Sequence, residues 1–95
     1  MKNVNPEQFE EFERITKELL ELSKRKNHDY GSENIGILGT KGVYVRIWDK
    51  VARLKRLLWD DKDAQVKDET LEDTVKDLCN YGIILIILLR NKWGK

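Results

Sequence analysis

Hydrophobic residues recur at helical spacing over three stretches of the chain, with polar residues filling the positions between them. In the first stretch, residues 5–26, the apolar positions are Phe9, Phe12, Ile15, Leu19 and Leu22. The stretch opens with Asn5-Pro6, which is typical of a helix N-terminus, because asparagine caps free amides and proline fits the first turn. The spacing therefore predicts a helix over residues 5–26.

Two further helices are predicted in the second half of the chain. The second, residues 43–59, has an apolar stripe made of Ile47, Val51, Leu54 and Leu58. The third begins at residue 68 or 69 and extends to about residue 92. Its stripe, which we expect to face the core, consists of Leu71, Val75, Leu78, Leu85, Ile86 and Leu89. No stretch alternates as a strand would, so the pattern predicts an all-α fold, a small bundle of three main helices.

Residues 83–89 form an unbroken apolar run, IILIILL. A membrane span needs roughly 20 such residues, so no membrane association is expected. A helix that is apolar on all sides is a buried one. The chain has 95 residues, which is one domain over residues 1–95 with little interior. We therefore expect a second subunit to cover this helix, and a homo-oligomer to complete the bundle.

The connection between the first two predicted helices, NHDYGSENIGILGTKG over residues 27–42, holds four glycines. It lacks the GxxxxGK and following Ser or Thr of a phosphate-binding loop. A connection this long in a small domain is more often functional than not, so we expect either a mobile loop over a site or a plain linker. Within it, Tyr30 is a candidate to stack on a nucleobase. His28, the only histidine, is a candidate substrate contact or a surface residue near a helix end.

Charged residues make up 37% of the chain but nearly cancel, leaving a net charge of +1. No direct nucleic-acid binding is therefore expected. The single cysteine, Cys79, excludes an intramolecular disulfide and fits a reducing cytosol. The N-terminus is acidic and polar, unlike a signal peptide. We expect a cytoplasmic protein.

The most informative polar pattern is ETLEDTVKDLCN, at residues 69–80. Read as a helix, it places Glu69, Asp73 and Asp77 at i, i+4 and i+8, along one face. Like charges at this spacing repel, so a sequence under no functional demand would tend to interrupt the row. Because Mg²⁺ takes oxygen ligands, the row predicts a Mg²⁺ site.

A second charged face lies on the preceding predicted helix. Arg46, Asp49, Lys50 and Arg53 are spaced i, i+3, i+4 and i+7, and so share one side. Opposite the carboxylates they would form a cleft in which a metal ion and cationic side chains neutralise a phosphate. The spacing leaves two simpler alternatives open. One is a set of interhelical ion pairs, each worth about 0–1 kcal/mol, and the other is a solvated face.

Three ordered segments carry a family resemblance: KNHDYGS at residues 26–32, RIWDKVARL at 46–54 and DETLEDTVKDLCNY at 68–81. With these motifs the chain resembles the nucleotide modification associated domain type 1 proteins of phages and bacteria, over about residues 15–90. That family is in turn similar to the MazG-like all-α nucleoside triphosphate pyrophosphatases. In those enzymes an ExxE on one helix and an ExxD on the next hold Mg²⁺ against the phosphates of a nucleotide.

The resemblance implies a Mg²⁺-dependent nucleotide-binding protein, a nucleoside triphosphate pyrophosphohydrolase acting on deoxynucleotides in phage nucleotide metabolism or DNA base modification. The expected catalytic residues and metal ligands are Asp49, Glu69, Asp73 and Asp77, with Glu18 and Glu21 as further ligands. The expected substrate-binding residues are Arg46, Lys50, Arg53, His28 and Tyr30. Two alternatives stay open: a protein that sequesters a nucleotide without hydrolysing it, and a helical adaptor that works through its apolar C-terminal helix.

Overall fold

The structure, a computed structural model, describes residues 5–95. Its elements are α1 (Pro6–Tyr30), α2 (Glu33–Leu54), the short π-helix η1 (Lys55–Trp59) and α3 (Leu71–Leu89). No strand occurs in this part of the chain, so the predicted all-α fold with three main helices is confirmed. None of these helices combines the length and apolar character that a bilayer-spanning segment needs.

The chain divides into two compact units at Gly31. The first unit contains α1, on which Leu19 is buried while Phe12 is 67% exposed. Helix α1 ends at Tyr30, and the following residue, Gly31, has a φ of 77° and donates its backbone N–H to the carbonyl of Asn27 at 2.8 Å. Glycine adopts this left-handed conformation without the steric cost that a side chain would bring. The second unit starts at Ser32 and contains α2, η1 and α3.

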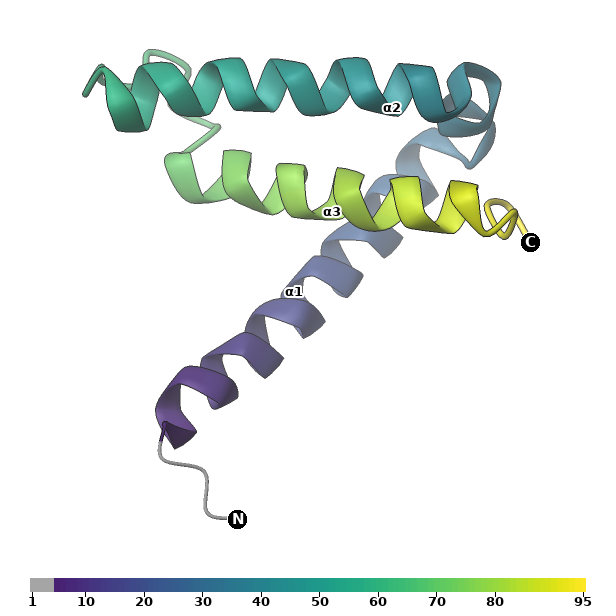
Figure 1. The fold of residues 1–95 in the computed structure, drawn as a ribbon, viewed down its shortest axis with the longest axis horizontal. Helices are drawn as coiled ribbons and strands as arrows, with labels where there is room; N and C mark the ends of the chain where they lie inside the picture. The colour runs from purple at the N-terminus through teal and green to yellow at the C-terminus, as the bar shows by residue number, and fades with distance from the viewer. Residues whose placement is uncertain (1–4) are drawn as a thin grey trace. The chain divides into compact units, whose positions relative to one another are not determined.

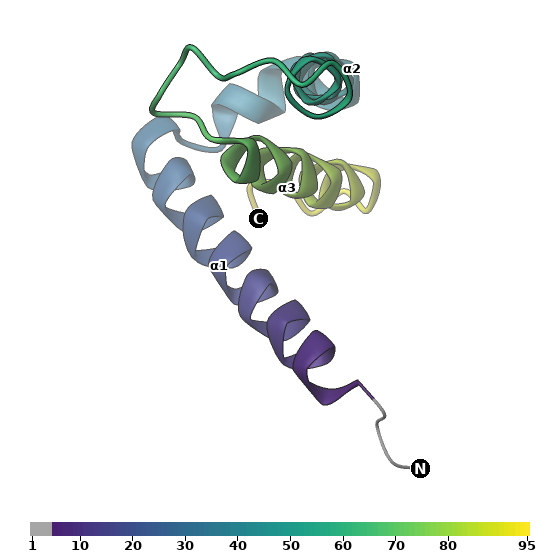
Figure 2. The same cartoon turned by 90° about the vertical axis from the view of Figure 1, so that its left-hand side faces the viewer.

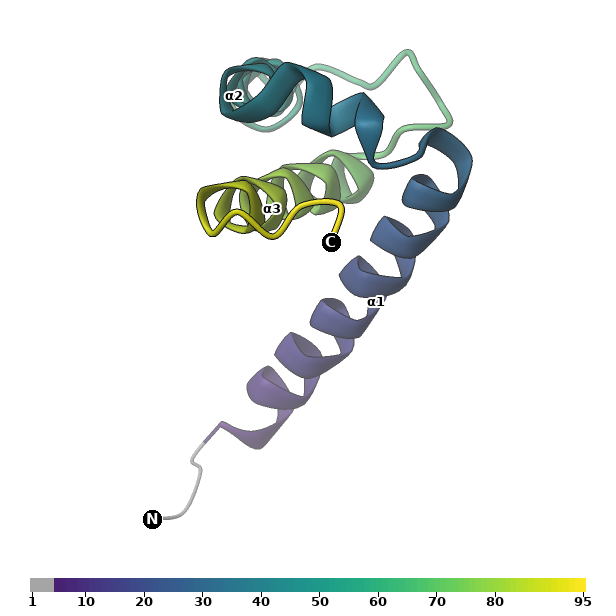
Figure 3. The same ribbon diagram turned by 90° about the vertical axis from the view of Figure 1, so that its right-hand side faces the viewer.

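The prediction of a loop over residues 27–42 is wrong, because helices occupy nearly all of it. Helix α1 continues to Tyr30, and α2 begins at Glu33. The glycines weaken a helix by only about 1 kcal/mol each, and the burial of Ile35 and Val43 offsets this cost. One glycine does interrupt the helix: Gly39 has a φ of 65° and a ψ of −157°, and the first turns of α2 change direction there (Figure 3).

Helices α2 and α3 run antiparallel and side by side (Figure 1), and Figure 2 shows the pair nearly end on. Val43 of α2 and Thr74 of α3 are completely buried. At one end the connection between η1 and α3 joins the two helices. At the other end Trp93, after α3, donates its indole N–H to the carbonyl of Ser32 at 2.8 Å. The second unit is therefore tied together at both ends.

The side of α3 that faces solvent differs from the predicted one. The stripe expected in the core is largely exposed, with Leu71, Val75, Ile86 and Leu89 all accessible to water. The buried side chains of α3 are the polar Thr74 and Asn80. The reason is that α3 turns its Thr74 side toward α2, where polar partners satisfy its hydrogen-bonding groups, and leaves the apolar stripe on the surface of the unit.

Candidate functional site

The centre of the charged cluster between α2 and α3 is the Lys50 ammonium group. It donates to Glu69 Oε1 at 2.7 Å and lies 3.0 Å from Asp77 Oδ2. The side chains of Lys50 and Asp77 are only 19% and 13% exposed. The interhelical ion pairs are therefore present, and they lie in a largely water-excluded position where an ion pair is stronger than at the surface. We call Lys50, Arg53, Glu69 and Asp77 the Lys50 cluster.

Glu69 reaches the cluster from outside the helix. Helix α3 begins at Leu71, so the prediction that Glu69 shares a helix face with Asp77 is wrong. Arg53 holds the segment instead: its guanidinium donates to the Glu69 carbonyl at 2.6 Å and to Thr74 Oγ1 at 2.9 Å. The Thr74 hydroxyl donates onward to the Thr70 carbonyl at 3.1 Å. The helix therefore starts later than the pattern predicts, yet the carboxylate still meets Lys50.

The surroundings of Lys50 stabilise its charged form. Burial by itself would lower its pKa, but the hydrogen bonds and charges of Glu69 and Asp77 outweigh burial and raise the pKa above the ordinary 10.5. Lys50 therefore remains a cation throughout the neutral range. Its ammonium group has three N–H donors, and the two carboxylates engage two of them, which leaves one for a further acceptor.

Asp73, which the sequence pattern predicts as a metal ligand, has a structural role at the start of α3. Its carboxylate accepts from the Thr70 backbone N–H at 3.1 Å and from the Thr70 hydroxyl at 2.9 Å, while its own N–H donates to Thr70 Oγ1. This reciprocal arrangement is a capping box, which satisfies free amides at the start of α3. Thr-x-x-Asp before an apolar run is its signature in sequence, and it accounts for this residue without a ligand.

Replacing Asp73 with alanine should lower the free energy of unfolding by about 1 kcal/mol, the typical value of a helix cap. The loss should be the same with and without Mg²⁺, because the cap needs no metal. Urea denaturation followed by circular dichroism measures it, with Glu72→Ala as the control, since Glu72 is an exposed residue of the same turn. A variant of unchanged stability that has lost Mg²⁺-dependent binding would instead identify Asp73 as a ligand.

The other predicted residues of α2 lie beside the cluster. Arg46, one turn before Lys50, is half-buried, and it forms no ion pair within residues 5–95. Its guanidinium is therefore available to an anion. Asp49 is exposed and contributes no contact to the Lys50 cluster in the described structure.

Four predicted site residues belong to the first unit and are exposed on α1. Glu21 pairs with Lys24 at 3.7 Å, and the carboxylate of Asp29 lies 3.2 Å from His28 Nδ1. Tyr30 is the last residue of α1 and is 70% exposed, so it does not lie in a loop as predicted. Glu18 lies one turn before Glu21. A role for these residues at the Lys50 cluster stays a prediction.

The carboxylates of the Lys50 cluster do not suit a metal site built from protein ligands alone, but they suit one that the phosphates of a substrate complete. Within the described residues, no three His, Cys, Asp or Glu side chains gather so as to hold a metal ion. A site built from protein ligands alone is therefore not formed. Mg²⁺, however, is commonly held by one or two carboxylates together with the phosphates of a substrate. Glu69 and Asp77, which converge on one ammonium group, fit this second kind of site.

A family model described as "Nucleotide modification associated domain 1" matches residues 26–89. The chain belongs to this family. The match runs from the end of α1 to the end of α3, so the domain contains every member of the Lys50 cluster. No curated protein and no solved structure matches the chain. The further similarity to MazG-like pyrophosphatases stays a prediction.

Proposed function

We propose that this domain binds a nucleotide through its phosphate groups at the Lys50 cluster, with Mg²⁺ held by Glu69 and Asp77. The observation that carries the proposal is the convergence of two carboxylates from different segments on one part-buried cation, inside the region that matches the family. Buried charges are costly unless they are paired, so a cluster of this kind is a candidate functional site.

The residues of α2 supply the contacts that a phosphate needs. Lys50 has a third N–H donor, and Arg46 offers a guanidinium group that pairs with phosphate oxygens in two-point geometry. Arg53 does not bind the ligand in this proposal, because both of its hydrogen bonds hold the start of α3. Bound Mg²⁺ would neutralise the charge on the phosphoryl oxygens.

The reaction we propose is hydrolysis of a nucleoside triphosphate, a deoxynucleotide in particular, to the monophosphate and pyrophosphate. Water would attack the α-phosphorus and lose its proton to a carboxylate of the cluster, and pyrophosphate would leave from the opposite side. Asp77 is the better candidate base, since it is held on the rigid helix α3, whereas Glu69 lies in the connection before it.

One observation favours a second function, nucleotide sequestration without hydrolysis. Both carboxylates of the cluster are paired with Lys50, and Asp73 is engaged in the helix cap. A general base must be free to accept a proton. If these pairs persist when a nucleotide binds, the domain would retain its ligand unchanged.

The test is to incubate the full chain with ordinary and modified nucleotides, with Mg²⁺ or with chelator, and to analyse the mixture by chromatography before and after denaturation. Monophosphate and pyrophosphate formed only with Mg²⁺ would establish the hydrolase. Intact ligand released only on denaturation would establish sequestration. If no nucleotide of the panel is hydrolysed and none is retained until denaturation, the proposal of nucleotide binding is contradicted.

Variants locate the site in the same assay. Asp77→Asn should weaken nucleotide binding at least about tenfold, which corresponds to 1.4 kcal/mol, because it removes a metal ligand and an acceptor of Lys50. Asp68→Asn is the control, since Asp68 is an exposed carboxylate just before Glu69. Equal effects of the two substitutions would show that the cluster is not the binding site.

A further inference from the structure

One face of α2 and η1 carries large apolar side chains that water reaches. Its positions are spaced alternately by four and three residues: Tyr44, Trp48, Val51, Lys55 and Leu58, followed by Trp59. This is the heptad spacing by which helices pack side by side. Tyr44 and Trp48 are 61% and 62% exposed, and Trp59 is 82% exposed. We call this face the α2 stripe.

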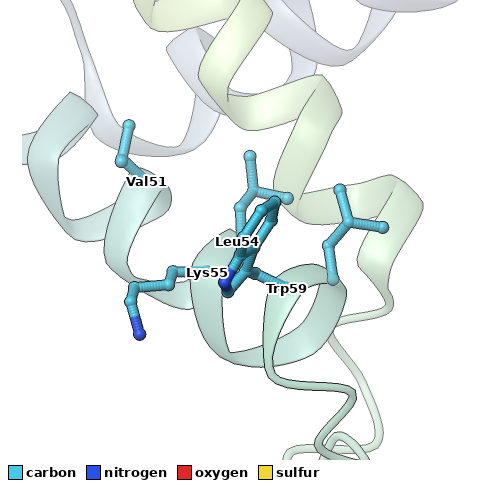
Figure 4. Close-up of a pocket in the computed structure, with 5 residues that line it drawn as sticks. Val51, Leu54, Lys55 and Trp59 are labelled. Atoms are coloured by element: carbon cyan, nitrogen blue, oxygen red, sulfur yellow. The ribbon is translucent and has the colours of Figure 1, made fainter.

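A groove on the same face is lined by Val51, Leu54, Lys55, Leu58 and Trp59 (Figure 4). Four of the five lining residues are apolar. The Lys55 ammonium group pairs with Asp60 at 3.1 Å, so the groove is bordered mainly by its methylene stem. The π-helical turn that shapes the groove is a rare conformation, found frequently at functional sites. A lining of this kind suits an apolar side chain from a partner and offers little to a charged ligand.

The exposed area is large for so small a unit. An aromatic side chain has roughly 150–250 Å² of surface, so the exposed parts of Tyr44, Trp48 and Trp59 amount to roughly 300–500 Å². That is about half of the roughly 800 Å² that each partner contributes to a standard interface. Val51 and Leu58, both exposed, enlarge it further. A stable association through this face is therefore within reach.

We infer that the α2 stripe is the surface through which two copies of this chain associate. The second unit needs such cover, because Ile35 and Val43 are its only buried hydrophobic residues in the described structure. A row at heptad spacing that is apolar at every position except Lys55 is complementary to itself, so the same stripe can pair with its own copy about a two-fold axis. With a net charge of +1, two copies scarcely repel one another. The inference is independent of the proposed function.

The test is the mass of the full chain in solution, measured by sedimentation equilibrium over a range of concentrations. The expected species is a dimer, at twice the chain mass of 11.2 kDa. Trp48→Glu should raise the dimer dissociation constant at least about a hundredfold while the helical circular dichroism is retained, because Trp48 is 62% exposed and lies outside the buried core. Val45→Glu is the matched control: it places the same charge on an exposed site of α2 outside the stripe.

Acrylamide quenching of tryptophan fluorescence supplies a second measurement. Quenching should increase as the wild-type protein is diluted below its dissociation constant, since Trp48 and Trp59 become accessible. A protein that is monomeric at all concentrations would overturn the inference. So would a dimer that Trp48→Glu and Val45→Glu weaken equally, because the interface would then lie elsewhere.

Discussion

Replacing Lys50 with methionine should lower the free energy of unfolding by about 2–4 kcal/mol at neutral pH. The substitution keeps most of the side-chain volume but removes the ammonium group shared by Glu69 and Asp77, and leaves Arg53, whose Nε lies 3.7 Å from Glu69 Oε1, as the remaining cation of the cluster. Removal of one partner from a buried pair is costly because the remaining charge stays desolvated. Urea denaturation followed by circular dichroism measures the change.

The control is Lys24→Met in α1. Lys24 pairs with Glu21 at 3.7 Å, but its side chain is 64% exposed, and surface pairs of this kind contribute about 0–1 kcal/mol. Equal losses of unfolding free energy in the two variants would show that the ion pairs of Lys50 contribute no more to stability than an exposed pair does.

The stability provided by Lys50 should also depend on pH. Its pKa is raised in the folded state, so the contribution is fully present below 10.5 and is lost as the pH rises through the folded-state value. The difference in unfolding free energy between the wild type and Lys50→Met should therefore be constant from pH 7 to 9 and should shrink above 10.5. A difference that does not change up to pH 12 would contradict the assignment.

Replacing Arg53 with methionine should cost about 2–4 kcal/mol, and Arg53→Lys should recover less than half of this loss. The guanidinium spans two acceptors, the Glu69 carbonyl and the Thr74 hydroxyl, and hydrogen bonds from charged groups contribute about 1.5–3 kcal/mol each. Thr74 is completely buried, so its hydroxyl would have no water to replace the lost donor. A lysine retains the charge but lacks the planar fork that reaches both acceptors at once.

The same variants should displace the start of α3. Without Arg53, nothing fixes the Glu69 carbonyl, and amide hydrogen exchange over residues 70–74 should accelerate more than exchange over residues 84–88. Arg56→Met is the control, because Arg56 is exposed in η1. Uniform acceleration along α3 would mean that Arg53 acts on the whole unit and not on the helix start.

The sequence predicts the three helices well because their apolar spacing and end signals agree. The prediction fails where the intrinsic conformational preference of the residues and their tertiary packing favour different structures. The glycines between residues 31 and 42 indicate a loop, yet only Gly31 and Gly39 adopt the left-handed conformation that glycine permits. Buried contacts of Ile35 and Val43 keep the rest helical. A glycine weakens a helix by only about 1 kcal/mol, so packing overrides its intrinsic preference.

The candidate site is predicted in its composition but not in its arrangement. The spacing places Lys50 and Asp77 correctly on facing helices, and the structure joins them. It also places Glu69 and Asp73 in one helical row, which is wrong for Glu69, because the Thr70 cap starts the helix after it. A carboxylate three residues after a threonine can serve a helix cap as readily as a metal, and the hydrogen bonds show Asp73 in the cap. Its role as a metal ligand stays a prediction.

The bond between Trp93 and Ser32 has a consequence for how the second unit comes apart. Terminal turns of helices usually fray before the middle does. Here the start of α2 and the segment after α3 hold each other, while Arg53 and the connection secure the opposite end. Neither end can loosen alone without giving up a contact to the other helix. The second unit should therefore unfold more cooperatively than is usual for a pair of helices.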